Sequence, residues 1–220
     1  ELGIPFSDPV AEGPVIQAAS QRALEGGVTC RKVFEMAREL RQEGLQVPFV
    51  IMTYANVPFA YGPDRFMEDC AVCGIDGLIL PDLPFEEKAE FEPACAAHGV
   101  ALISLVAPTS KERTARIARE ASGFLYLVSS LGVTGTRTRI DTDLDQIIGD
   151  IRAHSDNPVA IGFGISSPEQ ARDMSRKADG VIVGSAIVKL VAAHGKQAPE
   201  AVGSFVREMI QGMRGPETVT

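Results

Sequence analysis

Short apolar runs rich in Val, Ile and Leu alternate with amphipathic stretches along most of this chain. Six strand–helix pairs of this kind follow residue 46. Near-continuous apolar strands are typical of parallel sheets that are covered on both faces. The alternation therefore predicts an α/β fold. The expected strands are 47–54, 77–80, 101–106, 124–128, 159–162 and 180–183. The expected helices are 15–24, 30–43, 63–73, 86–98, 111–121, 143–155, 168–177, 186–192 and 199–213.

The number of pairs favours a (β/α)₈ TIM barrel. Residues 1–6 resemble the end of one further strand, and the sequence begins with Glu1 rather than Met. A complete barrel typically needs about 250 residues. We therefore expect a single barrel domain over residues 1–220 that lacks the first βα unit and most of the second strand. An open doubly wound sheet is the alternative, but it usually carries a G-x-G-x-x-G turn after its first strand, and this sequence has none.

Composition excludes several classes of protein. The 21 Lys and Arg residues against 29 Asp and Glu give a formal net charge of −8, which argues against a basic nucleic-acid-binding surface. No apolar run approaches the roughly 18 residues that a membrane-spanning helix needs. Four cysteines are too few for a disulfide scaffold, and they fit the reducing conditions of the cytoplasm.

Three glycine-rich segments follow neighbouring predicted strands. They are Gly132-Val-Thr-Gly135, Gly162-Phe-Gly164 and Gly184-Ser185, and the last opens a short predicted helix. Glycine turns that lead into a helix N-terminus present free amides to a phosphate, and TIM barrels often bind phosphate after strands seven and eight. Any one of these segments alone is better explained by a tight turn. The three together predict a phosphate site.

Carboxylates also stand near predicted strand ends. Glu1 and Glu12 flank the first of these ends, and Asp82 follows the strand 77–80. Two carboxylates that face one pocket can divide acid and base roles. From spacing alone, however, we favour an ordinary terminal residue for Glu1 and a solvated loop acid for Glu12, and Asp82 is equally a turn or cap residue.

The spacing of the cysteines resembles that of zinc ligands. Cys70-Ala-Val-Cys73 and Cys95-Ala-Ala-His98 have the pairwise spacing of zinc ligands. The stretch between them contains a buried strand and most of a helix, unlike a zinc-binding loop. We expect these cysteines to be core residues and predict no metal.

The sequence as a whole resembles the tryptophan synthase α subunit family. The resemblance begins with ELGIPFSDPVAEGP at residues 1–14 and covers essentially the whole chain in order. The further matching segments are Tyr54-Ala-Asn56, Pro81-Asp82, Tyr126-Leu-Val-Ser129, Gly132-Val-Thr-Gly135, Gly162-Phe-Gly-Ile-Ser166 and Gly184-Ser-Ala-Ile-Val188. The family has a TIM-barrel fold and cleaves indole-3-glycerol phosphate to indole and D-glyceraldehyde 3-phosphate.

The resemblance implies roles for particular residues. Glu1 matches the family's general acid/base. Glu12 stands where the family usually has aspartate, the carboxylate that stabilises the indole N–H. Thr134 matches the loop residue that hydrogen-bonds this second carboxylate. The residues that match positions around the indole ring are Tyr54, Tyr126 and Phe163. The residues that match the phosphate cradle are Gly135, Gly164, Gly184 and Ser185.

The resemblance also implies a partner and a pathway. It implies a lyase of L-tryptophan biosynthesis that needs no cofactor of its own and joins the β subunit in an α₂β₂ tetramer. Pyridoxal phosphate is expected only in that β subunit. The sequence leaves two alternatives open. One is a free-standing indole-3-glycerol phosphate lyase, and the other is a catalytically silent subunit that only binds and activates β.

Overall fold

The computed structural model describes residues 1–108, 110–128, 144–162 and 164–214. The chain divides into two compact units. The first unit consists of Glu1–Ala11, Gln17–Leu105 and Ala121–Gly123, and the second of Glu12–Ile16, Val106–Glu120 and Phe124–Thr220.

The first sheet is parallel and has the strand order β1-β2-β3-β4. Its strands are β1 (Leu2–Gly3), β2 (Val50–Met52), β3 (Gly77–Ile79) and β4 (Ala101–Leu102). Leu2 pairs with Ile51, and Ile51 pairs with Leu78, so these three side chains point to the same face. Because the strands are parallel, the segments that follow them meet at one edge of the sheet.

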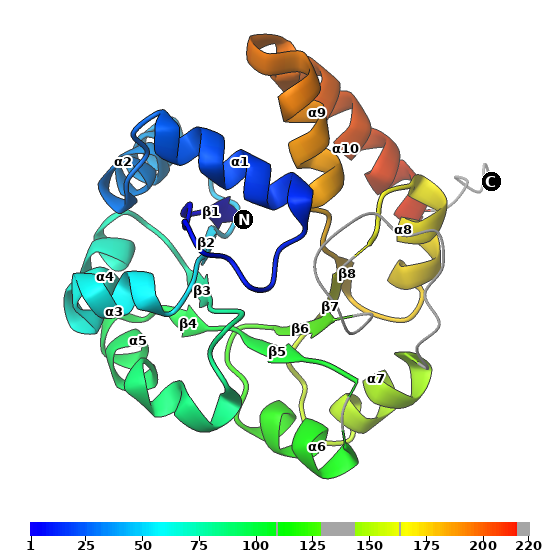
Figure 1. Cartoon of the computed structure of the whole chain (residues 1–220). Coiled ribbons are helices and arrows are strands. Elements are labelled where there is room, and N and C mark those ends of the chain that lie inside the picture. Colours follow the sequence, from blue (N-terminus) through cyan, green and yellow to red (C-terminus); the bar gives the residue numbers. More distant parts are fainter. Residues whose placement is uncertain (109, 129–143, 163, 215–220) are drawn as a thin grey trace. The chain divides into compact units, whose positions relative to one another are not determined.

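The helices of the first unit cover that face of the sheet. Figure 1 shows α2, α4 and α5 on the same side of strands β1 to β4. The helices are α1 (Pro14–Glu25, which begins in the second unit's segment), α2 (Cys30–Gln42), α3 (Asn56–Tyr61), α4 (Pro63–Val72), a 3₁₀ helix (Phe85–Glu90) and α5 (Glu92–His98). The core between them contains Val33, Phe34, Ile51, Phe66, Met67, Cys70, Cys73, Leu78 and Cys95. The prediction that Cys70, Cys73 and Cys95 are core residues is confirmed.

Apart from shifted end residues, the structure differs from the predicted elements at three places. The helix predicted over 86–98 is divided, because Pro93 stands at the start of α5 and cannot donate to a preceding turn. The strand predicted over 101–106 is also divided. β4 belongs to the first sheet, and β5 (Ser104–Val106) belongs to the second. The short helix α3 falls in a segment for which no helix was predicted.

The second sheet has the order β5-β6-β7-β8. Strands β6 (Leu125–Val128), β7 (Val159–Gly162) and β8 (Gly180–Val181) are parallel to one another. The helices are α6 (Lys111–Arg119), α7 (Leu144–Arg152), α8 (Pro168–Ser175), α9 (Ser185–His194) and α10 (Ala198–Arg214), with the 3₁₀ helix Gly195–Gln197 between the last two. Helix α10 packs against α8 and α9. No helix in the described ranges is both long and apolar enough to cross a membrane.

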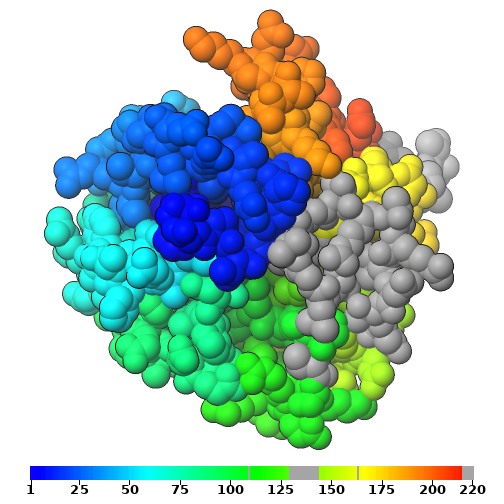
Figure 2. Space-filling view, viewed as in Figure 1, coloured from blue at the N-terminus to red at the C-terminus, as the bar shows by residue number. Residues whose placement is uncertain are grey.

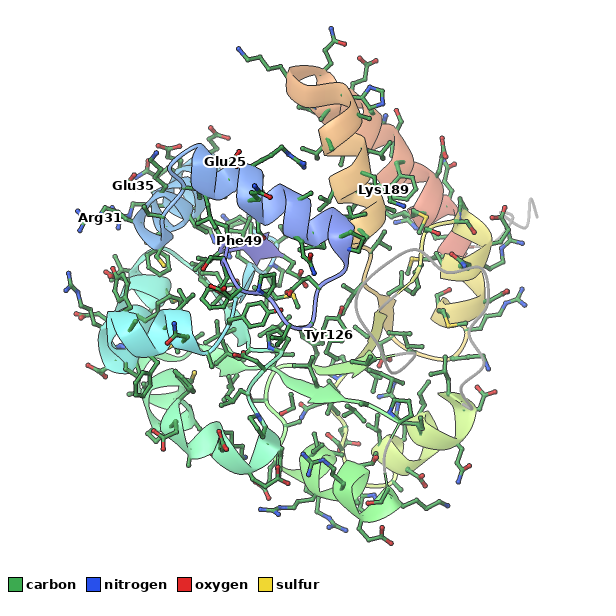
Figure 3. All side chains as sticks on the ribbon, in the orientation of Figure 1. Glu25, Arg31, Glu35, Phe49, Tyr126 and Lys189 are labelled. Carbon is green, nitrogen blue, oxygen red and sulfur yellow. The ribbon has the colours of Figure 1, made fainter. Side chains whose placement is uncertain are left out.

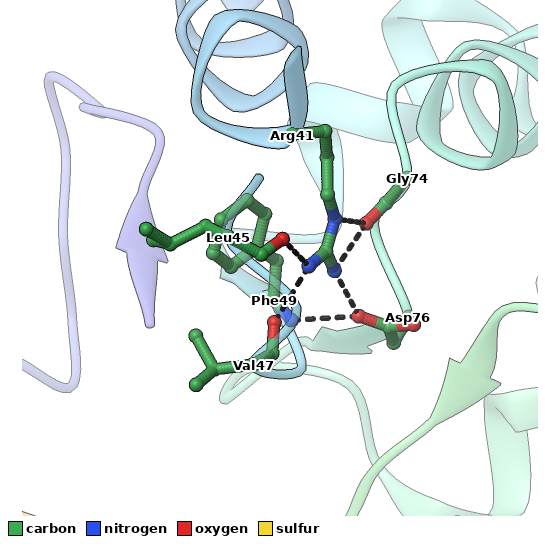
Figure 4. A network of polar contacts seen from close by, with 6 residues as sticks. All are labelled: Arg41, Leu45, Val47, Phe49, Gly74 and Asp76. Carbon is green, nitrogen blue, oxygen red and sulfur yellow. Dashed lines mark hydrogen bonds and ion pairs between the residues drawn. The ribbon is translucent and has the colours of Figure 1, made fainter. Parts of the chain in front are cut away.

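An arginine–aspartate contact occurs at the start of a strand in each unit. Asp76 Oδ2 accepts the amide of Phe49 at 2.7 Å and the guanidinium of Arg41 at 2.7 Å (Figure 4). Arg41 also donates to the carbonyls of Leu45, Val47 and Gly74. In the second unit, Asp179 Oδ2 accepts the amide of Val159 at 2.7 Å and a bond from Arg152. In both units the aspartate therefore fixes the beginning of the neighbouring strand, at the edge opposite to the strands' carboxyl ends.

Candidate active site

Glu1 stands one residue before β1. Leu2 packs into the helix-covered core, so alternation along the strand directs Glu1 to the opposite face of the sheet. The start of the chain reaches the surface in Figure 2, and Glu1 as a whole residue is exposed. Its carboxyl group nevertheless lies among many protein atoms. This desolvation raises the pKa of the Glu1 carboxyl.

Tyr54 follows β2 and is 4% exposed. Its hydroxyl oxygen accepts the amides of Val10 at 2.9 Å and Ala11 at 2.8 Å. Its ring stacks on Phe6, with 5.0 Å between the ring centroids. Tyr54 therefore lies at the carboxyl edge of the first sheet, where the resemblance predicts an indole-contacting residue, and it also holds the segment after β1.

Asp82 has a structural contact. Its Oδ1 atom accepts the amide of Ala55 at 2.9 Å, which ties the segment after β3 to the segment after β2. Of the two interpretations left open for Asp82, the turn or cap residue is the one that this bond supports. The sequence signal for it is the Pro81-Asp82 pair directly after an apolar strand.

Glu12 belongs to the second unit and directly follows Ala11 of the first. The residue is only 7% exposed, although it stands in a loop before α1. Buried carboxylates are rare in proteins unless they are paired or serve a function. The interpretation of Glu12 as a solvated loop acid is therefore wrong.

Tyr126 and the glycines of the second unit lie on adjacent strands or in the segments that follow them. Tyr126 is on β6 (labelled in Figure 3) and is 5% exposed. Gly162 ends β7, and a Cβ atom on it would lie 2.3 Å from the Tyr126 hydroxyl oxygen. Gly162 was not among the predicted site residues, although the Gly162-Phe-Gly164 pattern contained it. Gly164 has a φ of +91°, a conformation that favours glycine.

Gly184 and Ser185 form the beginning of α9. Gly184 is the N-cap residue, and no side chain caps this helix. By contrast, Ser110 and Ser167 accept hydrogen bonds from the first turns of α6 and α8. Among the residues that the structure describes, none comes within 4 Å of a Cβ atom placed on Gly184. Within the described part of the chain, the first turn of α9 therefore has amide donors that no side chain caps and open space beside its cap residue, as a bound anion requires.

Three of the predicted site residues lie outside the described residues. They are Thr134, Gly135 and Phe163. Within the described ranges, no group of three or more His, Cys, Asp or Glu side chains is arranged to hold a metal ion. The first unit thus contains Glu1 and Tyr54, and the second contains Glu12, Tyr126, Gly164, Gly184 and Ser185.

Comparison with known proteins identifies the family. The profile of the family described as "Tryptophan synthase alpha chain" matches residues 1–214. The tryptophan synthase alpha chain of Lacticaseibacillus casei is 48% identical over 209 residues, which cover 95% of this chain and 78% of the relative. That of Shouchella clausii (strain KSM-K16) is 52% identical over 191 residues, which cover 87% of this chain and 71% of the relative.

Solved structures agree with this match. A crystal structure of the tryptophan synthase alpha chain from Legionella pneumophila has a TM-score of 0.86 at 36% identity, and the match covers 99% of this chain and 81% of that one. A structure of the tryptophan synthase α₂β₂ complex from Pyrococcus furiosus has a TM-score of 0.84 at 35% identity, with coverage of 95% and 84%. These relatives confirm the predicted α/β fold of the TIM-barrel type. The chain belongs to the tryptophan synthase alpha chain family.

Proposed function

We propose that this protein is a lyase that cleaves indole-3-glycerol phosphate to indole and D-glyceraldehyde 3-phosphate. The observation that carries the proposal is the family match over residues 1–214, a range that includes every residue predicted for the site. We also propose that the two units belong to one barrel domain, since a single family profile spans both.

The reaction needs two proton transfers and one stabilised charge. A proton added at C3 of the indole makes the ring cationic. Glu1 then removes the proton of the side-chain hydroxyl, the bond between C3 and the hydroxyl-bearing carbon breaks, and its electron pair returns to the ring. The hydroxyl-bearing carbon becomes the aldehyde of glyceraldehyde 3-phosphate. Because the indole ring itself accepts the electron pair, this chain needs no cofactor.

The surroundings of the two carboxyl groups support these roles. Burial raises the pKa of the Glu1 carboxyl, and a raised pKa suits a carboxyl that acts as acid/base. The buried Glu12 is assigned to the indole N–H, where a carboxylate stabilises the developing positive charge. Tyr54, Tyr126 and Phe163 are assigned to the surroundings of the indole ring.

The glycines are assigned to the substrate's phosphate. The uncapped first turn of α9, with Gly184 and Ser185, supplies amides and the positive end of a helix dipole. Gly135 and Gly164 complete the proposed cradle, and Thr134 is assigned to hydrogen-bond Glu12. An acidic protein can bind phosphate in this way because the donors are local amides.

The proposed partner is the tryptophan synthase β subunit, in an α₂β₂ assembly that receives the indole. The solved P. furiosus relative is described as a mutually activated complex of this composition. We place pyridoxal phosphate in the β subunit and the whole assembly in the cytoplasm.

An indole-release assay tests the proposal. The protein is assayed with indole-3-glycerol phosphate alone and together with a β subunit. Indole release that rises on addition of β is the expected result, whereas release that β does not change indicates a free-standing lyase. Activation of β without indole release indicates a silent subunit. Glu1→Gln should abolish release, and the matched change Glu25→Gln, on the exposed end of α1, should not.

A further inference from the structure

The end of β2 contacts the segment after β1 at successive points. The first contact is made by Thr53, which is 2% exposed and whose Oγ1 atom donates to the carbonyl of Ile4 at 3.3 Å. The second is the stacking of Tyr54 on Phe6. The third is the pair of bonds from the amides of Val10 and Ala11 to the Tyr54 hydroxyl oxygen. The chain from Ile4 to Ala11 therefore curves around the Tyr54 side chain.

The hydroxyl oxygen of Tyr54 is the acceptor for both backbone amides, Val10 and Ala11. A tyrosine hydroxyl oxygen has two lone pairs, so two N–H donors at 2.9 and 2.8 Å use its acceptor capacity. Backbone amides that lose such an acceptor carry a desolvation penalty, and the segment would shift to find another one. The conformation of Val10 and Ala11 thus depends on one oxygen atom.

Glu12 is the next residue along the chain. The backbone direction at Ala11 sets where the Glu12 side chain begins. A carboxylate that stabilises charge must be placed within a fraction of an ångström. A contact that fixes the backbone at Ala11 therefore affects the position of the Glu12 carboxylate. Tyr54 makes this contact although it is distant from Glu12 in sequence.

We propose that Tyr54 is a positioning residue, whose hydroxyl fixes the Val10–Ala11 backbone and thereby the carboxylate of Glu12. This inference rests on the proposed lyase function. It gives Tyr54 a role besides contact with the indole ring. Removal of the hydroxyl then lowers kcat through Glu12 and leaves the affinity for the substrate nearly unchanged.

The test uses Tyr54→Phe, which removes the hydroxyl and keeps the ring that stacks on Phe6. The matched control is Tyr61→Phe, since the Tyr61 hydroxyl donates to Asp69 within the helices of the same unit. We expect Tyr54→Phe to lower kcat for indole release in the complex with β by about 10- to 100-fold, with little change in KM. We expect Tyr61→Phe to leave both values at those of the parent.

A double variant separates positioning from a general structural effect. In a Glu12→Ala background there is no carboxylate to position, so adding Tyr54→Phe should cost almost nothing more. An equal loss in both backgrounds overturns the proposal. So does a rise in KM at constant kcat, which would mean that the hydroxyl contacts the substrate directly.

Hydrogen exchange gives a readout that does not need activity. The amides of Val10 and Ala11 should be protected in the parent and should exchange faster in Tyr54→Phe. The amide of Thr53, which bonds the carbonyl of Ile79, should be unchanged. Unchanged exchange at Val10 and Ala11 overturns the positioning contact itself. A parent that releases no indole instead refutes the lyase function, and this inference with it.

Discussion

The ring of Tyr126 occupies the space that a side chain on Gly162 would need. Built on the backbone of Gly162, a Cβ atom would lie 2.3 Å from the Tyr126 hydroxyl oxygen and 2.4 Å from Cε1. The two residues are diagonal neighbours, because Val128 pairs with Gly162 across β6 and β7. The position of the Tyr126 ring therefore depends on the absence of a side chain at residue 162.

Gly162→Ala should displace Tyr126 and lower both stability and activity. Overpacking of this kind costs about 1–3 kcal/mol, measured by denaturant unfolding. Gly180→Ala on the neighbouring strand is the control, since its Cβ would lie 3.9 Å from the Cβ of Ala160. Adding Tyr126→Val to Gly162→Ala should recover part of the lost stability. If the losses of unfolding free energy from the two changes simply add, the Tyr126 ring is not what excludes a side chain at residue 162.

Gly184→Asp should separate stability from substrate binding. A carboxylate at the start of α9 interacts favourably with the helix dipole, so the Tm of the free protein should not fall. The same charge repels a phosphate at those amides, and KM for indole-3-glycerol phosphate should therefore rise strongly. Gly184→Ala, which has room for its methyl group, should raise KM much less. If the Asp variant keeps the parent's KM, the phosphate binds elsewhere.

Glu12→Asp should be tolerated and should keep or raise kcat. The change restores the residue usual in the family and shortens the side chain by one methylene. Glu12→Ala should lose the stabilisation of charge at the indole nitrogen, which is worth about 3 kcal/mol in comparable sites. Steady-state rates of indole release measure both variants. Equal rates for Glu12→Ala and the parent would remove Glu12 from the mechanism.

The pH dependence of catalysis should reflect the titration of the Glu1 carboxyl. Burial raises the pKa of its carboxyl above the usual value near 4.5, so the acid limb of kcat/KM should have its midpoint above that value. The native state also holds this proton more tightly than the unfolded state, so the Glu1 contribution to stability declines as pH rises from the usual to the raised pKa. Glu1→Gln should therefore be inactive, yet no less stable than the parent at neutral pH. A destabilised Glu1→Gln variant would show that the ionised carboxylate supports the fold.

Local sequence patterns predict most of the helices and strands of this fold. The apolar runs predicted the strands because a buried strand needs apolar residues at nearly every position. The division of a helix before Pro93 and the presence of the short helix α3 were not predicted, because helix boundaries depend on neighbouring elements as well as on the residues themselves.

The site was less predictable than the fold. The burial of Glu12 cannot be read from spacing, because the exposure of a loop acid is decided by whatever packs around it. The Tyr54 contact joins residues 44 positions apart, and no local pattern indicates it. The family resemblance predicts roles for these positions, and the structure adds the burial of Glu12 and the contacts of Tyr54.

Asp179→Asn should reduce stability in a way that depends on pH and leave catalysis unchanged. The amide of Val159 lowers the pKa of Asp179, and Arg152 lowers it further. A carboxyl with a lowered pKa adds stability above its usual value near 3.8 and loses it as pH falls through the lowered pKa. The parent should therefore be more stable than Asp179→Asn at neutral pH, and the difference should shrink in strong acid.

Thermal unfolding from neutral to strongly acid pH measures this difference, with Asp173→Asn, a change of an exposed acid on α8, as the control. Because Asp179 lies at the start of β8, opposite the end that leads to Gly184, kcat and KM should stay at the parent's values. A stability difference that is constant across this pH range would show that the charge of Asp179 does not contribute and that only the shape of the side chain does.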